Sequence, residues 1–137
     1  MLSTVESPQV EDQRRHNRAL VHGLVEIVND RNHDALAEVA TGQIAREAER
    51  WIGPFRDSFP DFRMDVVDVI AEVDKVVGHF NCSGTHTGAW HGIPATGRRF
   101  NDVDEIYIFR VKDGKLDSIL AVVEDNLTRM RQLGLNG

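Results

Sequence analysis

The chain has 137 residues, of which 41% are hydrophobic and 28% are charged, so its length suits one domain with a single core. Its net charge of -6 argues against nucleic acid or an anionic membrane as the main partner, because both favour clustered Lys and Arg. The single cysteine, Cys82, excludes an intramolecular disulfide and zinc sites built on several thiolates, and no apolar run approaches the ~20 residues that span a bilayer.

The first part of the chain is expected to be mostly helical. Residues 1–11 are polar and lack the charged-then-apolar order of a signal peptide, so we expect a soluble, cytoplasmic protein with a flexible tail before one domain at 12–137. Apolar residues at helical spacing predict a helix from Asp12 to about Asn32, and a short helix should follow over 32–40. A third helix, over 43–59, is expected to break at Gly53-Pro54.

The pattern changes at Arg63, where β-branched residues become frequent. Four strands are predicted, at 64–73, 75–86, 98–111 and 115–125, the last two joined by a Lys-Asp-Gly turn. A short helix should follow and end at Gly134. Helices followed by about four antiparallel strands predict an α+β domain, with the sheet packed against the helices.

Alternation along the second predicted strand divides its side chains between two faces. Val76, Phe80 and Cys82 share one face, and the other is more polar and holds Val77, His79, Asn81, Ser83 and Thr85. A curved sheet with the polar set on its concave face, under a helical lid, would enclose a cavity. A sheet with one face in water is the alternative.

Four segments carry motifs that are more specific together than any is alone. They are FPDF at 59–62, GTHTGAWHGIPATGRRF at 84–100, DEIYIFRVKDGKL at 104–116 and EDNLTRMRQLG at 124–134. Over residues 12–135 the chain resembles the SnoaL-like polyketide cyclase family. The resemblance implies the cone-shaped nuclear transport factor 2-like (NTF2-like, also cystatin-like) α+β fold, with N-terminal helices packed on a curved, mostly antiparallel sheet. It also implies a cofactor-independent polyketide cyclase of antibiotic biosynthesis, which closes a ring by aldol condensation on a polycyclic aromatic substrate.

The resemblance implies a catalytic carboxylate near the end of the last strand. Counting back from Gln132-Leu133-Gly134 places it at Asp125, which we prefer. Counting forward from Gly114-Lys115-Leu116 places it at Glu124, as if the chain carried one extra residue, such as a β-bulge. Only one of the two neighbours can face the cavity, because successive strand residues point to opposite faces. The structural alternative is that both are surface acids, or that Asp125 caps the last helix.

Such a carboxylate fits the chemistry, because desolvation in an apolar pocket raises its basicity enough to remove a proton beside a carbonyl. The resulting enolate is delocalised into the substrate, so no cofactor is expected. His79 is predicted to assist as a catalytic residue, although it could instead be bonded to a strand neighbour. The histidines show no metal-ligand spacing, so no metal site is expected.

A hydrophobic or aromatic small molecule, the expected partner, needs apolar walls. The predicted substrate-binding residues are Tyr107, Trp51, Phe55, Trp90, His91 and Asn81. Trp51 and Phe55 also suit ordinary core at their i, i+4 spacing, and His91 a solvent-facing loop. His86 is interpreted as structural. Many members of the family carry His-Trp where this chain has Ile119-Leu120, so one polar pocket group is missing.

Other functions on this fold stay open. Asp104 and Glu105 are interpreted as solvated edge charges, although paired carboxylates bridged by Arg occur in epoxide hydrolases of the same fold. An isomerase, dehydratase, epoxide hydrolase or hydroxylase-related enzyme is the alternative, as is a non-catalytic ligand-binding and oligomerising module. A homodimer or homotetramer is expected through an outer sheet face that carries Val66, Ile70, Ile106 and Ile108.

Overall fold

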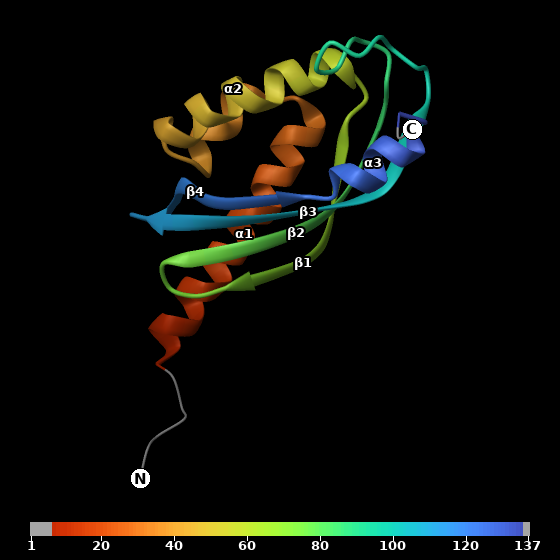
Figure 1. Ribbon diagram of the computed structural model, residues 1–137. Helices are drawn as coiled ribbons and strands as arrows, with labels where there is room; N and C mark the ends of the chain where they lie inside the picture. The colour runs from red at the N-terminus through yellow and green to blue at the C-terminus, as the bar shows by residue number, and fades with distance from the viewer. Residues whose placement is uncertain (1–6, 136–137) are drawn as a thin grey trace.

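A computed structural model of the chain describes residues 7–135. Its helices cover one face of an antiparallel sheet (Figure 1). The elements are α1 (Pro8–Asp30), the 3₁₀-helix η1 (His33–Glu38), α2 (Gly42–Ser58), β1 (Arg63–Ala71), β2 (Lys75–Thr85), β3 (Arg99–Lys112), β4 (Lys115–Glu124) and α3 (Asn126–Gln132). The four strands lie in the order β1-β2-β3-β4, so the predicted α+β class is confirmed. Helix α1 packs against β1 and β2, and α2 lies against β4.

Helix α1 begins four residues earlier than predicted. Ser7 caps it, with its Oγ accepting a hydrogen bond from the Val10 backbone N–H at 3.2 Å. Pro8 is favourable at the first helical position, because its missing N–H would have no partner there. The predicted tail is therefore wrong for residues 8–11, which are helical. Residues 1–6 of that tail lie outside the described residues.

Helix α2 runs through Pro54, so the predicted break at Gly53-Pro54 is wrong. A proline costs a helix one hydrogen bond, here to the carbonyl of Arg50. The turn that follows is held by other contacts, because the Phe59 N–H donates to the Phe55 carbonyl at 2.8 Å. The Phe55 ring also packs against those of Phe59 and Phe62, with centroid distances of 4.6 and 4.9 Å.

The alternating apolar side chains of β2 point toward the helices and are buried there. Val76, Phe80 and Cys82 are each at most 1% exposed, whereas His79 lies on the opposite, outer face and pairs across the sheet with Ile106. The predicted alternation is confirmed, but its orientation is wrong, because the polar set lies outside. Burying the apolar set under α1 removes more hydrocarbon from water.

Two irregularities change which residues face the core. The register of β1 shifts between Val66 and Asp68, so Val66 pairs with Phe80 and packs toward the core. Val66 therefore does not share the outer face with Ile70, as was predicted. Strand β4 is also irregular, because its register shifts twice and leaves Asp117 and Leu120 as extra residues, which are bulges of the kind that was expected.

Within residues 7–135, no helix has both the length and the apolar character that crossing a membrane requires.

Candidate functional site

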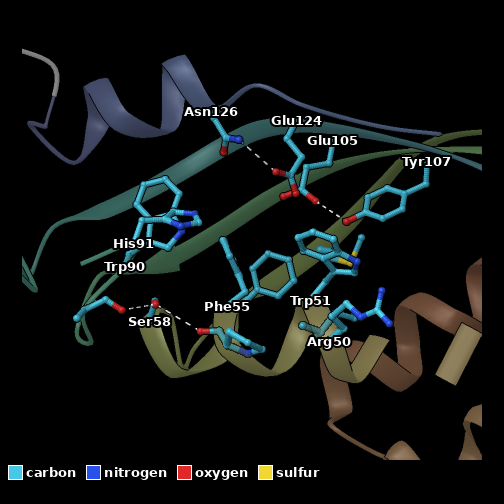
Figure 2. Close-up of a pocket in the computed structure, with 15 residues that line it drawn as sticks. Arg50, Trp51, Phe55, Ser58, Trp90, His91, Glu105, Tyr107, Glu124 and Asn126 are labelled. Carbon is cyan, nitrogen blue, oxygen red and sulfur yellow. Dashed lines mark hydrogen bonds between the residues drawn. The ribbon is translucent and has the colours of Figure 1, made fainter. Parts of the chain in front are cut away.

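A cavity lies between α2, the helix-covered face of the sheet and the loop that joins β2 to β3. It consists of two adjoining pockets of about 460 and 300 Å³. The two pockets share five lining residues, which are Trp51, Ile52, Met64, Tyr107 and Glu124. Most of the lining of both pockets is hydrocarbon. Figure 2 shows the two carboxylates of the larger pocket close together, with Glu124 bonded to Asn126 and Glu105 bonded to Tyr107.

Five of the six predicted substrate-binding residues line the larger pocket. They are Trp51, Phe55, Trp90, His91 and Tyr107. Trp51 is 67% exposed, so it forms part of the pocket wall rather than the core. Figure 2 shows Trp51 and Phe55 on α2 facing Tyr107 on the sheet, with Trp90 and His91 at the other end. The structure thus brings these residues together, while their role in binding stays a prediction.

The loop after β2 closes this end of the pocket and is fastened to the end of α2. The Thr87 and Gly88 N–H groups each donate to the Ser58 carbonyl at 3.1 Å, and the Ser58 hydroxyl donates to the Ala89 carbonyl at 2.6 Å. His91 and Gly92 form a two-residue hairpin turn, both with positive φ (49° and 77°). The turn therefore projects His91 at the pocket rim.

His86 has the structural position that was expected. Its side chain is fully buried and its ring stacks on Phe59 at 5.4 Å between centroids. Its Nδ1 accepts a hydrogen bond from the Thr96 N–H at 3.2 Å, which ties the two arms of the loop together.

Glu105 is the most deeply placed carboxylate of the pocket. It is 2% exposed, and its Oε1 accepts a hydrogen bond from the Tyr107 hydroxyl at 2.9 Å. Its Oε2 lies 2.5 Å from Arg129 Nη2, which donates to it from α3. The Arg129 guanidinium is itself buried, between the rings of Phe55 and Phe100, at 5.2 and 4.7 Å from their centroids.

Glu124 brings a second carboxylate to the same place. It pairs with Glu105 across β3 and β4, and its Oε2 lies 4.0 Å from Arg129 Nη1. The Asn126 side-chain amide donates to Glu124 at 3.2 Å and also accepts a hydrogen bond from Arg129. The Glu124 side chain is 34% exposed, so it is reached by solvent and Glu105 is not. Two carboxylates therefore face one pocket and share one arginine.

Burial sets the proton affinities in this cluster. Desolvation raises the pKa of Glu105, and the charge of Glu124 adds to the rise, while Arg129 opposes it. Burial, with the nearby charge of Glu105, raises the pKa of Tyr107 well above its ordinary value of about 10. Glu105 is thus a stronger base than an exposed carboxylate. Tyr107 keeps its proton at neutral pH and can donate a hydrogen bond.

The preference for Asp125 over Glu124 as the cavity-facing carboxylate is wrong. Asp125 caps α3, with its carboxylate accepting from the Thr128 N–H at 3.1 Å and from the Thr128 hydroxyl at 2.7 Å. These hydrogen bonds lower the pKa of Asp125. Asp125 lines neither pocket, whereas Glu124 lines both. The forward count from the hairpin therefore gave the carboxylate that faces the pocket.

The predicted cavity positions of His79 and Asn81 are also wrong. His79 Nε2 lies 2.8 Å from Asp104 Oδ1 on the outer face of the sheet, which is the strand-neighbour contact that was the alternative. Asn81 pairs across the sheet with Asp104 and Asp65, and it lines neither pocket. Both residues follow the parity of β2 that faces away from the helices.

Sequence reasoning placed Glu105 among solvated charges, yet a signal for its position was present. Glu105 shares its strand parity with Val103, Tyr107 and Phe109, all of them buried or partly buried, whereas Asp104 has the opposite parity. Arg129 carried no comparable signal, because its position against Glu105 depends on how α3 docks on β3.

Among the described residues, 7–135, no three His, Cys, Asp or Glu side chains lie where they could hold a metal ion together.

Comparison with known proteins places this geometry in context. The family model of SnoaL-like polyketide cyclases matches residues 15–133. No curated protein matches the chain at a significant level. The solved structure of TsrD from Streptomyces laurentii is 26% identical, with a TM-score of 0.74, over 90% of this chain and 98% of that chain.

Two further structures show the same fold. IdmH from Streptomyces antibioticus, a candidate polyketide cyclase, is 27% identical, with a TM-score of 0.70, over 86% of this chain and 98% of that chain. A candidate SnoaL-like polyketide cyclase from Jannaschia is 20% identical, with a TM-score of 0.78, over 98% of this chain and 100% of that chain. The NTF2-like fold expected from the sequence is confirmed.

Proposed function

Because the chain belongs to the SnoaL-like polyketide cyclase family, we propose that it is a cofactor-independent enzyme that closes a ring on a hydrophobic polyketide by acid/base catalysis. The observation that carries this proposal is Glu105, a buried carboxylate of raised pKa that lines an apolar pocket beside the Tyr107 hydroxyl. The description of IdmH as a candidate polyketide cyclase is consistent with it.

In the proposed reaction Glu105 removes a proton from the carbon beside a substrate carbonyl. A desolvated carboxylate is a suitable base for this step, because burial raises its pKa above that of an exposed carboxylate. The single Tyr107 hydroxyl proton, which is donated to the Glu105 carboxylate before the reaction, turns to the enolate oxygen once Glu105 has taken the substrate proton and stabilises it by a hydrogen bond. The enolate carbon then attacks a second carbonyl of the same molecule, and the Glu105 carboxyl group returns its proton to the alkoxide that forms.

Arg129 acts through Glu105 as a positioning residue. Its Nη2 holds the Glu105 Oε2 atom, which leaves Oε1 on the side of Tyr107. The second carboxylate, Glu124, sits 4.0 Å from Arg129 and favours a protonated Glu105 once the proton has been taken. The cluster thereby combines a base that can accept a proton with a fixed geometry.

Substitution of the base tests this proposal. Glu105→Gln keeps the shape of the side chain and removes its basicity, so proton exchange beside a carbonyl should fall by about 100-fold or more. The measurement is deuterium incorporation into the methyl group of 2-acetylnaphthalene in D₂O, followed by NMR.

The matched control is Asp104→Asn, the same loss of a carboxylate on the next residue and the opposite face. It should exchange the ketone at the wild-type rate. Circular dichroism of both variants checks that they fold. A folded Glu105→Gln protein that exchanges the probe as fast as wild type would remove Glu105 as the base.

A second candidate function has its own observation. Glu105 and Glu124 share Arg129, the arrangement of two carboxylates and an arginine that occurs in epoxide hydrolases of this fold. In that version the solvent-reached Glu124 would activate water and Glu105 would protonate the leaving oxygen. Incubation with styrene oxide in ¹⁸O-labelled water distinguishes the two, because only the hydrolase releases a labelled diol.

The outer sheet face supports self-association into a homodimer or homotetramer. Its apolar residues, on all four strands, are Ile70, Val77, Ile106, Ile108 and Val123, placed together by the strand pairing. Ile70 and Val123 are more than 60% exposed in one chain, which is unusual for aliphatic side chains gathered on one surface.

A further inference from the structure

We propose that the natural substrate has two arms, a flat unsaturated arm and a flexible aliphatic arm, joined at the reacting carbons. The inference rests on the proposed function only for where the chemistry takes place. The two arms follow from the shape and lining of the cavity, which consists of two lobes of different character on either side of the carboxylates.

The larger pocket is here named the aromatic lobe, because four ring-bearing residues line it and do not line the smaller pocket. Phe55, Phe62, Trp90 and His91 belong to this lobe alone, and Trp51 stands at its junction with the other. Ring faces favour flat, conjugated groups, which they bind by stacking and edge contacts. A flexible alkyl chain would gain less there than a planar system.

The smaller pocket, here named the aliphatic lobe, has a different wall. Seven of its ten own residues are branched or small hydrocarbon side chains from α1, α2 and β4, which are Leu24, Val28, Ile44, Ala48, Ile119, Ala121 and Val122. The other three are Glu47 and the two sheet phenylalanines Phe80 and Phe109, which are almost fully buried. Apart from the shared Tyr107 and Glu124, the proposed chemistry uses no residue of this lobe. Its volume is about 300 Å³, and its five shared lining residues place it directly beside the aromatic lobe.

The three polar groups of the proposed chemistry lie at the junction of the lobes or next to it. Tyr107 and Glu124 line both lobes, and Glu105 lines the aromatic lobe next to Tyr107. A substrate that reacts at Glu105 can therefore extend in both directions from its carbonyl. A molecule with its reacting group at one end would fill only one lobe. It would lose the van der Waals contacts with the walls of the other.

The test uses 2-acylnaphthalenes, in which a flat ring and an alkyl chain flank one ketone. Binding constants are measured by isothermal titration calorimetry for acyl chains of two, four, six and eight carbons. Each CH₂ moved from water into an apolar site is worth about a fourfold gain in affinity when fully buried. We expect a gain of about two- to fourfold per CH₂ until the lobe is filled.

Substitutions assign the chain and the ring to their lobes. Val122→Phe fills the aliphatic lobe from a side chain that is 45% exposed there, so the core is not overpacked. It should abolish the dependence on chain length and leave the two-carbon ketone unchanged. Leu120→Phe is the control, because Leu120 is similarly exposed on the same strand and lines neither lobe. Ala89→Leu narrows the aromatic lobe and should weaken every ketone by the same factor.

Affinity that does not change with chain length in the wild-type protein would overturn the proposal. So would a Val122→Phe protein with the wild-type chain-length dependence. Failure of the acid/base function is a separate result, because it appears in the deuterium exchange of Glu105→Gln and leaves these affinities unchanged. Either proposal can therefore fail while the other stands.

Discussion

Neighbouring residues of the same chemical type have opposite environments in this protein. Asp104 is exposed beside His79 and Glu105 is buried beside Arg129, although they are adjacent in β3. Glu124 faces the pocket and Asp125 caps the next helix. A strand turns each successive side chain by half a revolution, so one position decides between water and the pocket. For Glu105, the buried position raises the pKa of the carboxyl group.

The capping role of Asp125 predicts a pH-dependent stability. Its hydrogen bonds to Thr128 lower its pKa in the folded state, so its contribution is present above the unfolded pKa of about 3.9 and is lost as the pH falls through the folded value. Asp125→Ala should therefore lower the free energy of unfolding at pH 7, and the difference from wild type should shrink below about pH 4.

Urea unfolding at a series of pH values measures this difference, and Asp117→Ala, on β4, serves as the control without a cap. The same Asp125→Ala protein should keep the deuterium exchange activity, because Asp125 lines neither pocket. Activity lost in a fully folded Asp125→Ala protein would return this residue to the catalytic role that the family resemblance implied.

At the scale of elements, the pocket depends on how the loop after β2 joins α2. The Thr87 and Gly88 N–H groups of the loop donate hydrogen bonds to the carbonyl of Ser58, the last residue of the helix. At Gly88 the backbone of the loop is in close contact with the backbone of α2. A Cβ atom at Gly88 would lie 2.1 Å from the Asp57 carbonyl oxygen, which no small adjustment relieves. This contact holds Trp90 and His91 against the open end of the pocket.

Two glycine substitutions should therefore have opposite effects on stability. Gly88→Ala forces the loop away from α2 and should lower the free energy of unfolding by about 1–3 kcal/mol. Gly53→Ala lies inside α2 with nothing within 4 Å of the added methyl group, so it should raise the free energy of unfolding by about 0.5–1 kcal/mol.

Thermal and urea unfolding of the two variants gives both values. A stabilised Gly88→Ala protein would mean that the loop does not rest on the end of α2. A destabilised Gly53→Ala protein would mean that this turn of the helix, next to Pro54, is less regular than the structure describes.

At the scale of the whole molecule, one face of the sheet is covered by helices and the other is not. The uncovered face joins exposed aliphatic residues from β1 and β4 across the centre of the sheet, with the His79–Asp104 pair beside them. Burying such a face against a second copy would remove the largest part of this hydrocarbon from water.

Self-association can be tested without disturbing the pocket. Light scattering at micromolar concentration should give the mass of a dimer or tetramer, and Val123→Asp should shift it toward the monomer. Val67→Asp is the control, because Val67 is also about half exposed but lies in the β1 bulge. A wild-type protein that is monomeric at these concentrations would contradict the oligomer.

Local patterns along the chain were enough to predict the kinds of element, most of their bounds and the family. All four strands were predicted within two residues at either end, and the last helix stops before Gly134, whose φ is positive, as predicted. Turn residues, β-branched runs and helical spacing are local properties, so they can be read without the fold. The cap at Ser7 is also a local feature, but it was missed. The helix through Pro54 was missed because its last turn is held by the packing of Phe55 against Phe59 and Phe62.

Packing between distant parts of the chain fixes which face of the sheet is inside and which carboxylates meet. Alternation in β2 is compatible with either set of side chains facing the core. The position of α1 over Val76 and Phe80 places the apolar set inside. The register of β3 and β4 then pairs Glu124 with Glu105 on the pocket side, and α3 brings Arg129 to Glu105. These outcomes depend on contacts between residues far apart in the chain. A local pattern can state that a strand has two faces, but only packing assigns one of them to the core.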